Sequence, residues 1–495
     1  MSTIAFIISL HFCVAVVIMP VSCSETMPPG LVIRVPLPGL NYVAQKEVMK
    51  FASQINGSSD FIPDSSEATE IANVSIRNVT VTDFVTGKTN VSIDPGNGII
   101  CQIDNARISL TAFLDCLDGP VSYSDDTVDG NLKVDTESMS VTIKSTVGIT
   151  SDGRPIALLL GCSTSVDNVR IVYHKNVFCA AREFVEITFL KTISDAVCRT
   201  ASEFFTKRVT ALLGTLKLTE TVQSKFIVDN HLVETPHLYP GFVEMDYKAE
   251  FRSKGDIFGS SFLPSEIDLP KTAPSMINFY VSEYSINTCL EAMFRKKYFA
   301  AIVKKQDLPT TNQSILSTAC GGGISFGCAF PDIPRRYPND STVLSIRAIA
   351  RPVLTISNNS ADLKAELEIC FLIKADNVRN ISTVILHLMA TTVVNASVVG
   401  NKLAGELGDF NSQIINITGN ATSNDYQHSL NPDLNILNRV LKSTWNLFIA
   451  QKLNEAAAIG IRLPTKAVVD LVKPDVTTIQ HAFVVTADFK YKREP

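Results

Sequence analysis

The sequence carries little net charge and no long run of one sign. Lysine and arginine number 44, and aspartate and glutamate 49, in 495 residues, which gives a formal net charge of −5 at pH 7. Nucleic-acid-binding surfaces need clustered cations, so nucleic acid is not an expected partner. Only one tryptophan is present, but hydrophobic residues make up 45% of the chain, which is enough for more than one core. Length and composition therefore predict a globular protein of two domains.

The common catalytic and metal-binding motifs are also missing. There is no Walker loop, no HExxH motif, no dinucleotide fingerprint, and no CxxC pair or Cys/His cluster with zinc-ligand spacing. The seven histidines are scattered along the chain. The sequence therefore predicts no metal, no cofactor and no site that brings an acid and a base together. We expect a protein that is not an enzyme.

One short motif could suggest a hydrolase, because residues 323–327 read GISFG and match the GxSxG nucleophile elbow. The elbow requires a strand before the serine and a helix after it. Here a Cys-Gly-Gly-Gly run precedes the motif, and Pro331 and Pro334 oppose a helix behind it. We therefore interpret the segment as a glycine loop pinned by a disulfide, and a serine hydrolase at Ser325 is the remote alternative. The histidines that follow in the required order are His387, His428 and His481.

The N-terminus differs in character from the rest of the chain. Residues 4–19 are almost entirely apolar, and small residues follow at 22–24, which offers a signal-peptidase site after about Cys23. A membrane anchor is the alternative, but the run is short for a span and lacks a basic flank. No later segment has an apolar run of spanning length. We expect residues 1–23 to be a signal peptide and the mature protein to be soluble, secreted and extracellular.

Asn-X-Ser/Thr sequons are dense, which agrees with passage through the secretory pathway. Chance occurrence in a chain rich in Asn and Ser is the alternative, but we expect most of the sites to carry N-linked glycans. Modified positions must face solvent. The candidate sites are Asn56, Asn73, Asn78, Asn90, Asn312, Asn339, Asn358, Asn380, Asn395, Asn416 and Asn420.

Cysteine usage fits an oxidising compartment. Nine cysteines remain once the two in residues 1–23 are removed, and an odd number leaves one unpaired. Spacing alone suggests two local disulfides, one between Cys101 and Cys116 and the other between Cys320 and Cys328. Connectivity cannot be deduced from one sequence, so the pairing of the others stays open.

Several segments alternate apolar and polar residues over unusual lengths, as antiparallel strands with one dry face do. The clearest are 139–149, 243–251, 363–375 and 483–491. In 243–251 we expect the apolar residues to point inward and Glu244 and Asp246 to point outward. Long, twisted, one-sided strands must curl around apolar material, which can be side chains or a ligand. The inward residues that we single out are Val243, Met245, Ile369 and Phe371.

Two long amphipathic helices are predicted from helical spacing of apolar residues, one over 181–216 and one over 433–458. Each half of the chain therefore has the same parts, long strands and one long helix. The apolar faces include Phe184, Ile187, Val197 and Phe204 in the first helix, and Leu434, Leu437, Leu441 and Phe448 in the second.

The two halves are separated by residues 252–276, which contain several Gly and Pro residues without sustained periodicity and are expected to form an extended linker. Immediately after it, residues 277–287 precede an apolar-periodic stretch much as residues 31–41 do. We therefore predict domains at 24–251 and 277–495 that are related by internal duplication.

Blocks along the whole chain resemble the family of bactericidal/permeability-increasing protein, lipopolysaccharide-binding protein and the plasma lipid transfer proteins. They are PGLVIRVPLPGLNYV, NLKVDTESMSVTIKSTVGI, GRPIALLLGCSTSVDNVRI, INFYVSEYSINT, NKLAGELGDF and the ending from LPTKAVVDLVKPDV to FVVTADFKYK. The resemblance implies an α+β fold, a boomerang of two elongated antiparallel β-barrels joined by a central sheet and pseudo-duplicated. Each barrel would wrap a long helix and hold one phospholipid-like molecule in an apolar tunnel. The family's single disulfide would fall on Cys162 and Cys198.

The sequence departs from the bactericidal members in its charge. Residues 24–255 hold 28 acidic and 21 basic side chains, a net charge of −7. The turns that we expect at the tip of the first barrel, near 86–89, 94–97 and 151–154, offer only Lys88 and Arg154 as cations. Recognition of lipopolysaccharide or another microbial glycolipid is therefore the alternative function, and antibacterial activity through a basic tip is doubtful.

The leading hypothesis is a secreted glycoprotein that binds, and could transfer, phospholipids or other long-chain amphiphiles. A membrane or lipoprotein surface would be a transient partner, and the sequence assigns no oligomeric state. For any single inward residue, core packing competes with lipid contact. The proposed lipid-binding set is Phe184, Ile187, Val197, Phe204, Val243, Met245, Ile369, Phe371, Leu437, Leu441 and Phe448.

Overall fold

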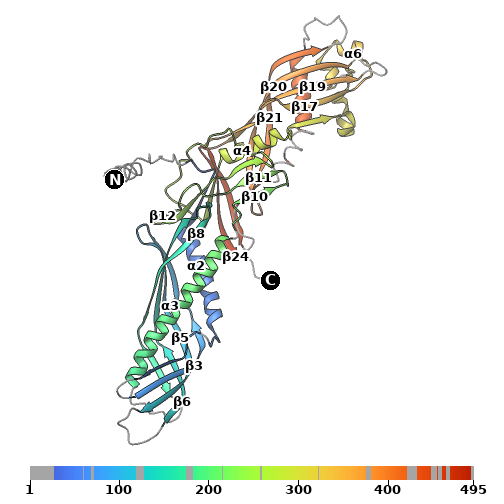
Figure 1. The fold of residues 1–495 in the computed structure, drawn as a ribbon. Helices are drawn as coiled ribbons and strands as arrows, with labels where there is room; N and C mark the ends of the chain where they lie inside the picture. The colour runs from blue at the N-terminus through green and yellow to red at the C-terminus, as the bar shows by residue number, and fades with distance from the viewer. Residues whose placement is uncertain are drawn as a thin grey trace, which may run out of the picture.

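The protein is an elongated, bent molecule with one lobe at each end and a sheet at the centre (Figure 1). The computed structural model describes residues 27–491 except 60, 69–71, 119–126, 174–181, 215, 257–258, 322, 375–380, 421–431, 447–453, 455–459 and 464–468. All strand pairing among the described residues is antiparallel and the sheets curl, with few helices. The expected signal peptide lies outside the described residues.

The N-terminal lobe is an eight-stranded sheet organised around one very long strand, β5 (Gly98–Asp118). One end of β5 pairs with β3 and β6, and the other end pairs with β4 and β7. Because a strand has only two edges, this change of partners curls the sheet. The other strands are β2 (Ser65–Ala68), β3 (Ala72–Val85), β4 (Lys88–Asp94), β6 (Thr127–Thr136), β7 (Met139–Ile149), β8 (Pro155–Val166) and β9 (Val169–Tyr173).

Two helices pack against this sheet, α2 (Leu37–Ile55) and the 33-residue α3 (Arg182–Gly214), so the long helix predicted over 181–216 is confirmed. The buried face of α3 is shifted from the predicted one. Ile187 is 59% exposed, whereas Val185, Phe189 and Ile193 are buried with Val197. The prediction for Ile187 was wrong because several neighbouring stripes of this helix are apolar, and only docking on the sheet selects one.

The central sheet contains the first strand of each half at its middle. Its order is β12-β13-β1-β15-β24-β23, and β1 pairs with β15 in antiparallel register. Strand β1 leads into α2 and β15 leads into α4 (Glu283–Arg295), so the similarity between residues 31–41 and 277–287 corresponds to a strand followed by a helix in each half. The strands are β1 (Leu31–Pro36), β12 (His237–Tyr239), β13 (Phe242–Tyr247), β15 (Ile277–Ser282), β23 (Val469–Ile479) and β24 (Ala482–Tyr491).

The strand predicted over 243–251 is broken in two. Ala249 has a positive φ of 46°, a conformation that interrupts an extended strand. The first piece, β13, joins the central sheet, while β14 (Glu250–Ser253) joins a three-stranded sheet with β10 (Thr219–Val222) and β11 (Phe226–Asp229). Glu244 and Asp246 are buried, 5% and 7% exposed, so the prediction that they face solvent was wrong.

The polar face of β13 is covered by the linker. Arg34 of β1 forms a buried ion pair with Glu244 and also donates to the carbonyl oxygen of Pro270. Leu269 packs against Val32, so the linker lies across the central sheet. Both faces of the middle strands β1, β13 and β15 are therefore largely buried, and the carboxylates of β13 lie between layers rather than in water.

The C-terminal lobe is a seven-stranded sheet in which β19, β20 and β21 are longest. Its core packs Ile369 and Phe371 of β19 against Leu437 and Leu441 of α7 (Leu434–Thr444). The strands are β16 (Ala300–Val303), β17 (Thr342–Ala348), β18 (Val353–Ile356), β19 (Ala361–Lys374), β20 (Ile381–Val399), β21 (Lys402–Asn420) and β22 (Ile461–Arg462). The short helices are η1 (Lys305–Asp307), η2 (Thr310–Leu316), α5 (Phe326–Ala329) and α6 (Ile333–Arg336).

The predicted helix at 433–458 is confirmed for its first part only, since most of 447–459 lies outside the described residues. Leu437 is fully buried, but Leu434 is 53% exposed and does not face the core. In the described part of the chain, no helix is both long and apolar enough to cross a membrane.

The disulfides agree with two of the three suggested pairs. Cys162 of β8 is bonded to Cys198 of α3, and Cys320 is bonded to Cys328. The pair Cys101 with Cys116 was wrong, because both residues lie on the single extended strand β5 and Cys101 is a free thiol. Spacing alone could not show this, since it does not say whether the chain turns between two cysteines.

The sequons lie mainly on the surface. Asn56, Asn78, Asn90, Asn339, Asn358, Asn395 and Asn416 are exposed, and Asn312 is half-buried. The side chains of Asn73, Asn380 and Asn420 lie outside the described residues. The exposed positions are therefore accessible for the N-glycosylation that we predict.

Candidate functional site

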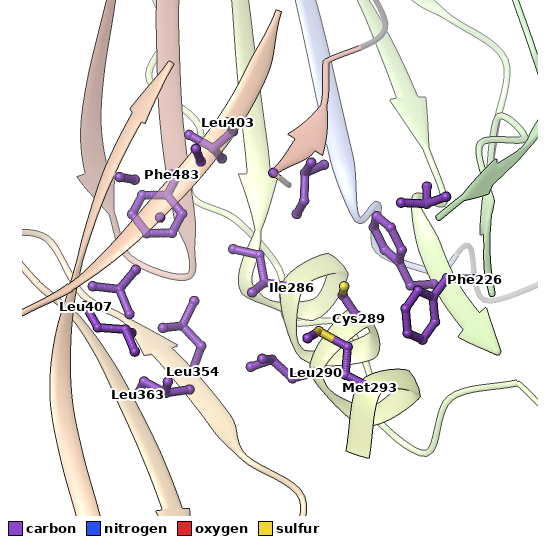
Figure 2. A pocket seen from close by; sticks show the side chains of 18 of the residues that line it. Phe226, Ile286, Cys289, Leu290, Met293, Leu354, Leu363, Leu403, Leu407 and Phe483 are labelled. Carbon is purple, nitrogen blue, oxygen red and sulfur yellow. The ribbon is translucent and has the colours of Figure 1, made fainter. Parts of the chain in front are cut away.

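An apolar chamber lies where α4, the small β10-β11-β14 sheet and the proximal part of the C-terminal lobe meet (Figure 2). Its cavity volume is about 180 Å³. The small sheet contributes Phe226 and Phe251, and the central sheet contributes Phe483. The short strand β18 contributes Leu354, and the long strands β19, β20 and β21 contribute Leu363, Val394, Ala396, Leu403, Ala404 and Leu407. Helix α4 contributes Ile286, Cys289, Leu290 and Met293.

In helix α4 the polar face is buried and the apolar face is the more exposed one, which is the reverse of an ordinary surface helix. Its polar residues Ser285, Thr288 and Glu291 are buried, at 0%, 1% and 6% exposure. Its apolar stripe of Ile286, Cys289, Leu290 and Met293 is only half-buried and lines the chamber. Figure 2 shows these four side chains spread along the helix, with Ile286 and Leu290 near Leu354 and Leu363. The helix therefore presents apolar surface to an internal cavity.

Hydrogen bonds explain how the polar face of α4 can be buried. The Ser285 hydroxyl donates to the carbonyl oxygen of Ala249 at 2.6 Å, and the Thr288 hydroxyl accepts from Phe251 N–H at 3.0 Å. Asn287 exchanges two hydrogen bonds with the backbone of Leu354. Buried polar groups cost little when they are fully paired. Three polar side chains therefore fix α4 to the small sheet on one side and to β18 on the other.

Carboxylates hold both ends of α4. At the start, Glu283 accepts from Ile356 N–H at 2.7 Å and pairs with His481 Nδ1 at 2.8 Å, while Ser282 caps the helix. At the end, Glu291 accepts from the hydroxyls of Ser260 and Ser261 in the linker at 2.6 and 2.7 Å. These contacts hold the helix rigidly beside the chamber.

The interior of the C-terminal lobe is divided into a filled part and an open part. Towards the far end, aromatic stacking fills the space, with Phe326 on Phe371 at 4.4 Å and Phe410 on Trp445 at 4.3 Å between ring centroids. Towards the centre of the molecule the same strands line the chamber. Small residues at Gly405 and Gly460 contribute to the lining there.

A second, more polar cavity of about 360 Å³ adjoins the chamber. The two share five lining residues: Val222, Gln223, Phe251, Gly460 and Ile461. Around the second cavity lie Lys402 and an ion pair between Arg462 and Glu220 at 3.0 Å. The combined space is therefore apolar at one end and polar at the other.

No charged side chain lines the apolar chamber among the residues that the structure describes. The Cys289 thiol is the titratable group in its wall, and burial raises the pKa of that thiol to about 12, so it is neutral at physiological pH. Such a lining has no acid, base or nucleophile in an active form, but it can hold a hydrocarbon chain.

Comparison with known proteins shows which family the chain belongs to. The sequence profile described as "LBP / BPI / CETP family, C-terminal domain" matches residues 220–491, which is more than half of the chain. The chain belongs to this family. The match covers α4, the chamber and the whole C-terminal lobe, so the residues of the chamber lie within the family's C-terminal domain.

Curated relatives match over most of their length. Lipopolysaccharide-binding protein of Bos taurus is 23% identical over 394 residues, which are 77% of this chain and 78% of the relative. Bactericidal permeability-increasing protein of Sebastes schlegelii is 20% identical over 473 residues, 94% and 95% of the two chains. A crystal structure of lipopolysaccharide binding protein superposes with a TM-score of 0.64 at 18% identity, covering 94% of this chain and all of that one. These chains share the fold.

For this family member, the residues that we singled out as lipid contacts are mostly core residues. Ile369, Phe371, Leu437 and Leu441 fill the C-terminal core and Val197 fills the N-terminal one. Val243 is buried in the central sheet, and Met245 packs against the cluster that contains Ile33 and Tyr247. The side chains of Phe184 and Phe448 lie outside the described residues. None of the residues in this set whose side chains the structure describes lines the apolar chamber.

Phe204 is the exception, because it lines a separate pocket between α2 and α3. That pocket has a volume of about 520 Å³ and includes Phe51, Phe61 and Arg199. The Phe51 and Phe204 rings meet edge to face with centroids 5.5 Å apart. The N-terminal lobe therefore has an opening beside its long helix.

The residues of α4 that line the chamber were not among our predictions. The signal is present in the sequence, since Ile286, Cys289, Leu290 and Met293 stand at positions i, i+3, i+4 and i+7 of a helix. Such a stripe ordinarily indicates the buried side of a helix. Nothing in the spacing shows that it faces a cavity.

The structure does not support a hydrolase site at Ser325. Its side chain is buried, the hydroxyl donates to Ala319 O at 2.9 Å, and the same oxygen accepts from Cys328 N–H at 3.2 Å to cap α5. His387 pairs with Glu368, and His481 pairs with Glu283. A four-residue helix does follow the serine, although we expected Pro331 and Pro334 to prevent one.

The expected place of the 151–154 turn at the tip of the first barrel was wrong. Leu232 N–H donates to the carbonyl oxygen of Gly153, and Arg154 donates to that of Leu216, so the 151–154 turn lies towards the centre of the molecule. Figure 1 places β8 near the centre and β3 and β6 at the far end of the lobe. Arg154 therefore cannot contribute to a distal cationic surface.

Two clusters bring acidic and basic side chains together that the sequence did not predict. His231 pairs with Asp229 beside Lys248, and His237 lies with Glu234 and Asp246 at the edge of the central sheet. These clusters combine residues from separate segments, which no single sequence motif reveals.

Proposed function

We propose that this protein binds phospholipids or similar long-chain amphiphiles and carries them with their acyl chains in the apolar chamber. The observation that supports this most directly is the orientation of α4. A helix that buries Ser285, Asn287, Thr288 and Glu291 and leaves its apolar stripe at a cavity gives up hydrophobic burial that a ligand can restore. The names of the relatives support a lipid-like ligand.

The polar cavity suits the headgroup of such a ligand. Lys402 and the Arg462–Glu220 pair stand where the apolar lining ends, so a zwitterionic or anionic headgroup would meet both donors and acceptors there. The sites would be non-catalytic, because the chamber contributes no activated group.

The N-terminal lobe would hold a second ligand. We infer that the two lobes are duplicated barrels. Each half begins with a strand that is followed by a helix, β1 and α2 in the first and β15 and α4 in the second, and the two strands pair at the middle of one sheet. The pocket between α2 and α3 would be the opening of the first barrel. The domains at 24–251 and 277–495, with 252–276 as the connecting linker, follow from this division.

Secretion and glycosylation belong to the same proposal. The apolar N-terminus would be removed as a signal peptide, and exposed sequons such as Asn90, Asn358 and Asn416 would carry glycans. Two disulfides fit an extracellular environment. Ligand would then be exchanged by transient contact with membranes or lipoprotein surfaces.

Recognition of a microbial glycolipid is the second candidate, and the names of the relatives favour it. The charge of the first half argues for the phospholipid instead, because residues 24–255 carry a net charge of −7 and Arg154 lies away from the tip. Salt-sensitive binding of lipopolysaccharide that exceeds binding of phosphatidylcholine vesicles would reverse this preference.

Lipid extraction tests the proposal directly. The full chain is secreted from eukaryotic cells, purified without detergent and extracted with organic solvent for mass spectrometry. We expect phospholipid in a stoichiometric amount. Recovery of no more than trace lipid, together with failure to take up a fluorescent phospholipid from vesicles, would refute it.

Two neighbouring residues of β20 provide a matched pair of variants. Val394 lines the chamber, and Val393 is 43% exposed on the other face of the same strand. Val394→Trp should fill the chamber and lower the amount of bound lipid, and Val393→Trp should leave it unchanged. Equal lipid content in both variants would show that the chamber is not the site.

A further inference from the structure

Three potential metal ligands converge at the edge of the central sheet, and none of them lines the apolar chamber. Glu234, His237 and Asp246 each place one ligand atom within 4.8 Å of the others. Glu234 Oε1 lies 3.2 Å from His237 Nε2. Asp246 belongs to β13, and the 230–237 segment is fixed beside it because Val233 N–H donates to Asp246 O at 2.9 Å. Backbone pairing therefore holds the three side chains together.

Asp246 is a buried carboxylate with unsatisfied hydrogen-bonding capacity. The residue is only 7% exposed, and its Oδ1 has no hydrogen-bond partner among the residues that the structure describes. A buried ionised carboxylate without partners is costly, and proteins ordinarily pair it with a cation or with donors. Oδ1 of Asp246 therefore has capacity for a donor or a cation that the described residues do not supply.

The charge around Asp246 is unbalanced. Glu234 and Glu244 add two further carboxylates, and Arg34 is engaged with Glu244. Burial, then the neighbouring Glu234 and Glu244, raise the pKa of Asp246 to about 7, which reflects the same excess of negative charge.

We propose that Glu234, His237 and Asp246 bind a divalent transition-metal cation, with Zn²⁺ as the fitting example. One imidazole and two carboxylates are the ligand types that Zn²⁺ takes at about 2.0–2.2 Å. Ligand atoms in a tetrahedral site of that size stand about 3.4 Å apart, so small side-chain rotations close the observed cluster. A fourth position remains for water or an external ligand.

A proton shared between Asp246 and Glu234 is the competing way to relieve the charge. It would satisfy the two carboxylates, but it gives no role to the His237 nitrogen beside them. A cation uses all three groups and neutralises two negative charges. Bound there, it would join β12, the edge strand of the central sheet, to β13, whose Asp246 stands opposite Val32 of β1.

Zinc titration of the intact protein tests this. The full-length, untagged glycoprotein is treated with EDTA, dialysed and titrated with ZnCl₂ in a calorimeter, and its melting temperature is measured with and without the metal. We expect one high-affinity Zn²⁺ per chain and a raised melting temperature, because a cation that binds only the folded state stabilises it.

Two uncharged variants separate this site from adventitious binding. Asp246→Asn keeps the side-chain shape, His237→Gln replaces the imidazole by a polar amide, and both should lose the stoichiometric binding and the thermal shift. His387→Gln, which changes a histidine paired with Glu368 in the C-terminal lobe, should keep both. Zinc uptake by the wild type that does not exceed uptake by Asp246→Asn would overturn the proposal. Unchanged melting of the wild type with Zn²⁺, combined with a higher melting temperature of Asp246→Asn above pH 7, would assign the site to a shared proton instead.

Discussion

Asn287 of α4 and Leu354 of β18 form a reciprocal pair of hydrogen bonds inside the protein. Asn287 Nδ2 donates to Leu354 O at 2.9 Å, and Leu354 N–H donates to Asn287 Oδ1 at 2.7 Å. The carboxamide thus satisfies both backbone groups of one residue, as a neighbouring strand would. This pair couples the helix that carries the apolar stripe to the strands that form the opposite wall of the chamber.

We expect Asn287→Ala to lower the free energy of unfolding by about 2–4 kcal/mol. Two buried backbone groups of Leu354 lose their partners, and each unsatisfied group costs roughly 1–3 kcal/mol. Urea denaturation followed by circular dichroism measures the change. Asn359→Ala is the control, since Asn359 is exposed and the sequon at Asn358 stays intact. Equal effects of the two substitutions would contradict the role of the pair.

The Glu291 carboxylate should make the attachment of α4 sensitive to acid. Burial would raise the pKa of Glu291, but hydrogen bonds from Ser260 and Ser261 and the nearby Arg295 outweigh it and hold that pKa below its ordinary value. A lowered pKa in the folded state means that the unfolded chain binds the proton more readily. Stability from this group is therefore present above about pH 4.5 and is lost as the pH falls through the folded-state pKa.

Comparison of the wild type with Glu291→Gln at pH 7, 5 and 3 measures this dependence. The variant should be less stable at pH 7, and the difference should shrink towards pH 3, where the wild-type carboxylate is protonated. Glu266→Gln removes an exposed carboxylate of the same linker and controls for the loss of one charge. A difference between wild type and Glu291→Gln that stays constant over this range would argue against the linkage.

The disulfide between Cys162 and Cys198 should be a major source of stability for the N-terminal lobe. It closes a sequence separation of 36 residues and fixes α3 to β8. Replacing both cysteines by serine should lower the free energy of unfolding by about 3–4 kcal/mol, chiefly by freeing the unfolded chain. Guanidinium denaturation without reductant measures the loss. Cys101→Ser removes a free thiol and should cost clearly less; comparable losses would contradict the assignment.

Ser325→Ala tests the hydrolase alternative and the cap of α5 in one variant. The substitution removes the oxygen that accepts from Cys328 N–H, and loss of such a cap costs about 1 kcal/mol. We expect no turnover of p-nitrophenyl esters by the wild type or the variant. Turnover by the wild type that disappears in the variant would restore the enzyme hypothesis.

Much of the secondary structure followed from periodicity, because alternation along β19 and helical spacing along α3 are local properties of the chain. Periodicity did not show which faces of the strands other parts of the protein cover. Glu244 and Asp246 alternate with apolar residues, yet the linker packs over them and Arg34 compensates one of the two. Alternation identifies two chemically different faces but does not show what lies on each.

The sequence by itself determined the long one-sided strands, the amphipathic helices, the linker and membership of a recognisable family, since each depends on residue types at fixed spacings. Only the tertiary structure decided where the empty space lies. The stripe of Ile286, Leu290 and Met293 has the same spacing whether it meets a core or a cavity. It lines a chamber because the buried hydrogen bonds of Asn287 and its polar neighbours turn the other face of α4 towards the protein, and those partners come from distant parts of the chain.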